Sequence, residues 1–172
     1  MTTAQQSLDA AYEGWNAGNL DRYLELYDDE IRLHGYSPEP MDKAEVTGFY
    51  EMIFRAFDSP KLAFHETFWD GDNCAIRFTM TGRHVAEFMG VPATSTEIVL
   101  PGITILHFRG DRVIERFSEA DMLGLLVQIA AVPAPGMRHL AYLQISPCST
   151  ANTAAPARVR RPVLSYTAAR WF

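Results

Sequence analysis

The chain has 172 residues, of which 48% are hydrophobic and 21% charged, and its formal net charge is −6. These values suit one globular domain with its own core. The sequence contains no run of 18 apolar residues, and it begins without the basic-then-apolar pattern of a signal peptide. We therefore expect a cytoplasmic protein that does not span a membrane.

The charges are distributed unevenly along the chain. All 21 acidic residues lie at or before Asp121, whereas the residues beyond it carry arginines and no acid. A strongly acidic body argues against nucleic-acid binding. The two cysteines, Cys74 and Cys148, are too few for a disulfide framework or a zinc site.

The first third of the chain predicts three amphipathic helices. Apolar residues recur at helical spacing over residues 3–17, 20–27 and 43–57, and Asp42 is placed to cap the third helix. Residues 30–35 alternate like a short strand. Each helix therefore needs a surface on which to bury its apolar stripe.

From residue 62 the apolar period changes from that of a helix to that of a strand. Four strands and a closing helix are predicted, at 62–69, 74–84, 96–108, 112–120 and 122–128. A run of helices followed by a run of strands is typical of the α+β class. We expect a curved antiparallel sheet wrapped around the N-terminal helices, as a cone whose open end forms a ligand pocket.

The domain is expected to end at residue 132. Residues 133–172 are rich in Ala, Pro, Arg, Ser and Thr, and they have no steady apolar period. Such a segment buries too little apolar surface to hold one structure, so we predict an irregular, poorly ordered tail.

The sequence gives no sign of a metal, a cofactor or a covalent nucleophile. No two of the five histidines have the i, i+4 spacing of a helical metal site, and no Cys/His cluster is present. A glycine-rich phosphate loop and a GxSxG elbow are also missing. Cys74 is interpreted as a buried strand residue.

Histidine and carboxylate groups remain for acid/base chemistry. His34 ends the first short strand. If the strands are regular, His84 shares an apolar face with Phe78, and His107 does the same with Ile105. Three imidazoles would then converge on the pocket and orient a small substrate. A structural role for each histidine is the alternative.

Asp121 stands where the last predicted strand gives way to the last helix. A carboxylate at the edge of an apolar pocket can take a proton from a carbon next to a carbonyl and return it to an alkoxide. The alternative is that Asp121 only caps the helix. Glu119, Arg83 and Arg116 are expected to be surface or strand-pair charges.

Four segments resemble the SnoaL-like polyketide cyclases of the nuclear-transport-factor-2-like superfamily. They are His34–Gly35, Thr81–Thr94, Ile103–Phe117 and Asp121–Ile129, and the resemblance covers residues 5–132. It implies the same cone, a homodimer formed through the sheet, and acid/base chemistry without a cofactor. In the anthracycline cyclases, a polyketide ester closes a ring by intramolecular aldol condensation.

Carried onto this chain, the resemblance makes Asp121 the catalytic aspartate and His107 its polar partner. His34 and His84 match recurrent pocket positions. We also expect four aromatic residues to bind the substrate, namely Tyr36, Phe78, Phe88 and Phe117. The chain departs from the family at Gly90–Thr96, which lacks a usual glycine and lysine, so the resemblance fixes the fold more firmly than the substrate.

Three functional hypotheses follow. The first is a metal-independent enzyme in which Asp121 and His107 move protons during aldol-type cyclisation of a polyketide-like or aromatic carbonyl compound. The second is isomerisation, dehydration or epoxide opening in the same pocket, and epoxide opening would need Arg83 or Arg116 to point inward. The third is a non-catalytic module with a wholly apolar pocket, in which Asp121 bonds only to its own helix.

Overall fold

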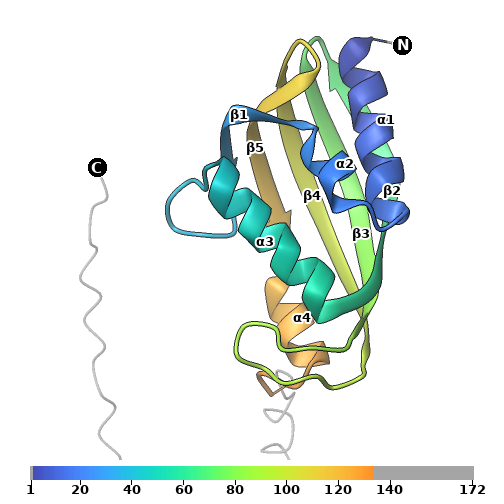
Figure 1. The fold of residues 1–172 in the computed structure, drawn as a ribbon, viewed down its shortest axis with the longest axis vertical. Helices are drawn as coiled ribbons and strands as arrows, with labels where there is room; N and C mark the ends of the chain where they lie inside the picture. Colours follow the sequence, from blue (N-terminus) through green and yellow to red (C-terminus); the bar gives the residue numbers. More distant parts are fainter. Residues whose placement is uncertain (1, 134–172) are drawn as a thin grey trace, which may run out of the picture. The chain divides into compact units, whose positions relative to one another are not determined.

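A computed structural model describes residues 2–133, and the predicted tail from residue 134 onward lies outside the described residues (Figure 1). The elements, in chain order, are α1 (Thr3–Asn16), α2 (Leu20–Leu24), β1 (Tyr27–His34), α3 (Lys43–Ala56), β2 (Phe57–Asp70), β3 (Asn73–His84), β4 (Glu97–Arg109), β5 (Arg112–Ala120) and α4 (Met122–Gln128). The predicted α+β class is confirmed. Asp42 caps α3 as expected, because its side chain accepts a hydrogen bond from the Glu45 N–H.

The five strands form one curved sheet in the order β1-β5-β4-β3-β2 (Figure 1). β2 to β5 are the antiparallel meander that the sequence predicts. β1 instead pairs with β5 in parallel, so the sheet is mixed rather than purely antiparallel. A parallel neighbour requires a long connection, and here α3 and three strands lie between the two partners in the chain.

The second helix is shorter than its apolar spacing predicts. α2 ends at Leu24, and Tyr27, which the spacing assigned to that helix, is the first residue of β1. Tyr27 pairs with Val113 of β5, and the Val113 N–H donates to the carbonyl of Leu26 at 2.8 Å. Pairing at the sheet edge therefore overrides the local helical pattern.

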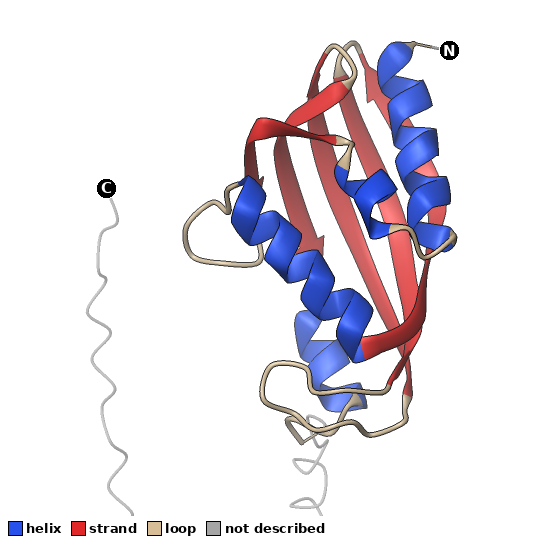
Figure 2. Cartoon of the chain, viewed as in Figure 1, coloured by secondary structure: helices blue, strands red, loops and turns tan. Residues whose placement is uncertain are grey.

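The helices α1, α2 and α3 lie over one face of the sheet (Figure 2). Buried residues from these helices and from the strands form one hydrophobic core. Along β4 the buried residues alternate with exposed ones, so Leu106 faces the helices while Ile103 and Ile105 face outward. We call these two sides the inner and the outer face. No helix within residues 2–133 is long and apolar enough to cross a membrane.

A β-bulge in β5 decides which of its side chains reach the inner face. His107 of β4 pairs with Glu115, yet the next residue, Phe108, pairs with Val113. Ile114 is therefore the extra residue, and the alternation along β5 shifts by one position beyond it.

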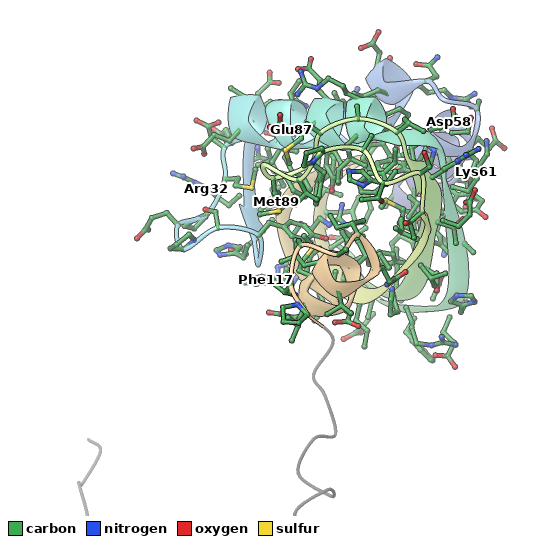
Figure 3. All side chains as sticks on the ribbon, turned by 90° about the horizontal axis from the view of Figure 1, so that it is seen from below. Arg32, Asp58, Lys61, Glu87, Met89 and Phe117 are labelled. Atoms are coloured by element: carbon green, nitrogen blue, oxygen red, sulfur yellow. The ribbon has the colours of Figure 1, made fainter. Side chains whose placement is uncertain are left out.

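Because of this shift, Arg116 and Ser118 are buried on the inner face, whereas Phe117 is 39% exposed. Figure 3 shows Phe117 on the side of the sheet away from α3. The bulge thus exchanges an aromatic side chain for an arginine in the interior.

Candidate active site

A pocket lies between the helices and the inner face of the sheet. Its wall is mostly apolar, and its aromatic members are Tyr12, Trp15, Tyr23, Tyr36, Phe49, Tyr50, Phe64 and Phe78. The empty space, mouth included, is about 700 Å³, but the part that the centre of a water molecule can occupy is about 50 Å³. Side chains therefore nearly fill the interior, and a ligand of several rings requires some of them to move.

Arg116 is the one charged residue among the described residues of the pocket wall. Its guanidinium donates to five hydroxyl groups, which are those of Tyr23 (2.9 Å), Tyr50 (2.7 Å) and Tyr27 on Nη1, and those of Thr104 and Ser118 (both 2.9 Å) on Nε. None of the ion pairs in the described part of the chain involves Arg116. Within residues 2–133, hydroxyl oxygens are therefore the only acceptors that bond to this buried cation.

The phenols of Tyr27 and Tyr50 remain protonated beside Arg116. Burial raises the pKa of Tyr27 and of Tyr50, although the positive charge of Arg116 opposes the shift in both. Burial acts to lower the pKa of Arg116, but the surrounding tyrosine oxygens outweigh it and leave that pKa above its ordinary value. The positive charge of Arg116 thus lies against the neutral hydroxyls of Tyr27 and Tyr50.

The cluster joins segments that are distant in the sequence. Tyr23 comes from α2, Tyr27 from β1, Tyr50 from α3 and Arg116 from β5. A hydrogen-bonded hub of this kind holds the helices on the sheet.

A tight turn after β1 brings Tyr36 to the pocket. Gly35 has φ +107°, and the carbonyl oxygen of Ser118 lies 1.8 Å from where a Cβ would stand, so no other residue fits there. Tyr36 then stacks on Phe49 with ring centroids 4.7 Å apart. Burial raises the pKa of its phenol.

Two of the four aromatic residues expected to bind substrate lie in the pocket wall, Tyr36 and Phe78. Phe88 is buried against Phe57, with ring centroids 5.1 Å apart, and does not line the pocket.

Cys74 is buried as expected, and burial raises the pKa of its thiol to about 12.

Of the three histidines expected to converge on the pocket, only His84 lies on the inner side. It is fully buried, its Nδ1 accepts a hydrogen bond from the Thr94 N–H at 3.3 Å, and its Nε2 has no partner among the residues that the structure describes. Its ring packs near Phe57 beneath the loop that follows β3, outside the pocket wall.

The expectation that His34 and His107 face the interior is wrong. Both lie on the outer face, where the Glu115 carboxylate is 3.1 Å from His34 Nε2 and 3.4 Å from His107 Nδ1. The expectation for Phe117 is corrected in the same way, since it stacks on His34 with centroids 4.4 Å apart. Both faces of β4 are apolar, so the sequence did not reveal which one is covered.

Asp121 caps α4, because its Oδ1 accepts a hydrogen bond from the Gly124 N–H at 2.8 Å. Its other carboxylate oxygen bonds to no residue in the described range. The carboxylate is exposed, and the next residue, Met122, forms part of the pocket wall. Asp121 therefore stands beside the pocket, and its catalytic role remains a prediction.

Arg116 is the pocket residue that the sequence analysis missed. Arg83 is exposed as expected, whereas Arg116 is 6% exposed. A signal was present in the tyrosines at positions 23, 27 and 50, because buried phenols need a hydrogen-bond partner.

Within residues 2–133, no group of three or more His, Cys, Asp or Glu residues is placed to hold a metal ion.

A curved α+β sheet whose helices enclose an aromatic pocket with one buried cation has the nuclear-transport-factor-2-like fold. The family model described as SnoaL-like polyketide cyclase matches residues 5–129, so the chain belongs to that family.

Solved structures of similar fold include AclR from Streptomyces galilaeus, with 23% identity, a TM-score of 0.70, and coverage of 76% of this chain and 97% of AclR. A SnoaL-like protein from Jannaschia sp. CCS1 has 19% identity, a TM-score of 0.67, and coverage of 76% and 94%. IdmH from Streptomyces antibioticus has 24% identity, a TM-score of 0.63, and coverage of 74% and 98%. Identities this low indicate a common fold only. A search of curated proteins found no match.

Proposed function

We propose that this protein is a cofactor-independent acid/base enzyme that closes a ring in a polyketide-like or aromatic carbonyl compound by an aldol-type reaction. The observation that carries the proposal is the aromatic pocket with Arg116 in its wall. Flat aromatic walls suit a planar conjugated substrate, and a fixed cation stabilises the negative charge that develops on a carbonyl oxygen.

Asp121 is the proposed base that removes a proton from the carbon next to that carbonyl. One of its carboxylate oxygens bonds to no described residue, and Asp121 directly precedes Met122 of the pocket wall; both features support this role. The enolate would then attack a second carbonyl of the same substrate, and Asp121 would return its proton to the new alkoxide. A positioned acid/base contributes about 10²–10⁴-fold in rate, and holding both ends together contributes much of the rest.

His107 has no part in this scheme. Its side chain is on the outer face with Glu115, so the thickness of the sheet separates it from the pocket. Any proton transfer by His107 would concern a ligand on that face.

The hydrogen-bond partners of Arg116 give less support to the alternative reactions. Arg116 points inward, as epoxide opening would require, but its hydrogen-bond partners in the described chain are hydroxyls rather than aspartates. A non-catalytic module would have a wholly apolar pocket, and Arg116 departs from that expectation. A non-catalytic module would also have Asp121 bonded only to its own helix, and among the described residues this is the arrangement observed.

Proton abstraction tests the proposal without knowledge of the true substrate. The probe is an aromatic β-keto ester such as ethyl benzoylacetate, whose methylene hydrogens exchange with D₂O and are followed by NMR. The wild type should accelerate exchange above the buffer rate, and Asp121→Asn should remove that acceleration. Equal rates for Asp121→Asn and wild type would rule out Asp121 as the base. No acceleration by the wild type would favour a binding module.

We also propose a homodimer formed through the outer face. Its exposed apolar side chains include Val99 (51%), Ile103 (55%), Ile105 (41%) and Phe117 (39%), which lie on β4 and β5. A second copy of the chain would remove this contiguous surface from water.

A cytoplasmic location remains a prediction from the sequence.

A further inference from the structure

Hydrogen-bond donors outnumber acceptors around Arg116. The guanidinium Nη2 donates to no described residue, although Nη1 and Nε are fully engaged. Trp15 supplies a second donor, because its buried indole Nε1 has no hydrogen-bond partner within residues 2–133 and its ring lines the same pocket. A buried donor without an acceptor is costly, so Trp15 Nε1 needs an explanation. Arg116 Nη2 is not among the fully buried unpartnered atoms of the described residues, so this nitrogen remains accessible to a ligand.

The tyrosines add a further donor. The hydroxyls of Tyr23 and Tyr27 are 3.0 Å apart, and those of Tyr27 and Tyr50 are 3.3 Å apart. Two contacts use two hydroxyl hydrogens, whereas three phenols supply three. Arg116 only donates, so it cannot accept the remaining hydrogen. One hydroxyl hydrogen of the cluster is therefore left for an acceptor outside it.

The charge of the cluster indicates what kind of acceptor is missing. Arg116 is buried, it belongs to none of the ion pairs in the described part of the chain, and the phenols nearest to it are neutral. A buried cation is normally paired with an anion, because neutral dipoles replace only part of its lost hydration. An anionic oxygen would satisfy the charge and the unused donors together.

We infer that the Arg116 end of the pocket is a binding subsite for an oxyanion carried by a planar conjugated ring, such as a carboxylate or a phenolate. The oxygen accepts hydrogen bonds from Arg116 Nη2 and from a tyrosine hydroxyl, and the ring lies among the aromatic side chains of the wall. This inference rests on the proposed function in one respect, namely that the ligand occupies this pocket. It adds that the ligand is anionic where it meets Arg116.

Two matched pairs of probes test the inference by isothermal titration calorimetry with the full chain. The first pair is 2-naphthoate and methyl 2-naphthoate, and the second is 4-nitrophenolate and 4-nitroanisole. The anion should bind about tenfold or more tightly than its neutral partner in at least one pair. The pair that shows the preference identifies the oxyanion as a carboxylate or a phenolate.

Variants assign the preference to Arg116. Arg116→Met should bind the anion and the neutral probe of the pair equally, whereas Arg83→Met, which alters an exposed arginine of β3, should keep the wild-type preference. If Arg116→Met does not fold, Tyr50→Phe should lower the affinity for the anion by a larger factor than the affinity for the neutral probe. A merely structural role would instead weaken both probes alike.

Two outcomes would overturn the inference, and they separate it from the proposed function. Equal binding of anion and neutral probe to the wild type in both pairs would remove the oxyanion subsite but keep the aromatic pocket. Failure of all four probes to bind would remove the subsite and would also contradict an aromatic substrate in this pocket.

Discussion

Nη1 of Arg116 in β5 lies 2.7 Å from the hydroxyl oxygen of Tyr50 in α3, so a charge-assisted hydrogen bond joins the sheet to the helices that cover it. The same guanidinium also reaches Tyr23 of α2 and Tyr27 of β1. One inward arginine thus connects the pocket to the packing of the whole domain.

This relationship predicts that Tyr50→Phe destabilises the protein by about 1.5–3 kcal/mol, the usual range for a hydrogen bond to a charged group. Urea unfolding followed by circular dichroism measures the change. Tyr12→Phe is the matched control, because Tyr12 lines the same pocket without a described hydrogen bond from its hydroxyl. Equal losses in the two variants would contradict a specific role for the Tyr50 hydroxyl.

The two roles of Asp121 can be separated by substitution. Asp121→Ala removes the α4 cap and should cost about 1 kcal/mol of stability, whereas Asp121→Asn retains a capping oxygen and should cost much less. Thermal unfolding of both variants measures this difference. Should Asp121→Asn prove as unstable as Asp121→Ala, the hydrogen bond to the Gly124 N–H would not explain the stability that Asp121 provides.

Stability should fall at high pH. Burial raises the pKa of Tyr27 and Tyr50 above the ordinary value of 10.0, so these phenols ionise in the unfolded chain before they do so in the folded one. Their contribution is therefore fully present below pH 10.0 and is lost as the pH rises beyond it, by about 1.4 kcal/mol per pH unit for each phenol.

Urea unfolding at a series of pH values on both sides of this threshold measures the slope. Tyr27→Phe should make the decline shallower, since one of the buried phenols with a raised pKa, which also include Tyr36 and Tyr50, is then missing. A stability that does not change as the pH rises beyond that threshold would show that the cluster is not buried in solution.

The proposed dimer predicts that a charge on the outer face separates the subunits. Ile105→Lys should convert the dimer to a monomer in size-exclusion chromatography with light scattering, because a buried unpaired lysine opposes association. Val85→Lys is the control, since Val85 is similarly exposed (45%) but lies in the loop after β3. A wild-type protein that is already monomeric would contradict the proposed interface.

Periodicity alone predicted most elements of the domain. The helix cap at Asp42, the meander of β2 to β5 and the start of α4 at Met122 follow from local rules and agree with the structure. The parallel pairing of β1 with β5 was not predicted, because it joins residues that are about 80 positions apart and leaves no local pattern.

The site was harder to predict. Its residues depend on which face of the sheet the helices cover and on the β-bulge in β5. Ile103 and Ile105 are as apolar as the buried residues of β4, so the sequence does not distinguish the inner face from the outer one. Beyond Ile114, strict alternation would place Phe117 inside and Arg116 outside, and the bulge reverses both. His107 and Arg116 were misplaced for these two reasons.

The central claim is that a planar anionic ligand enters the pocket beside Arg116 and Trp15. The indole N–H signals of an ¹⁵N-labelled sample test it directly during titration with 2-naphthoate. The Trp15 signal should move, because its unpartnered Nε1 lies in the pocket wall, while the signal of Trp69, which lies outside that wall, should stay in place. A titration in which the Trp15 signal does not move would contradict the account.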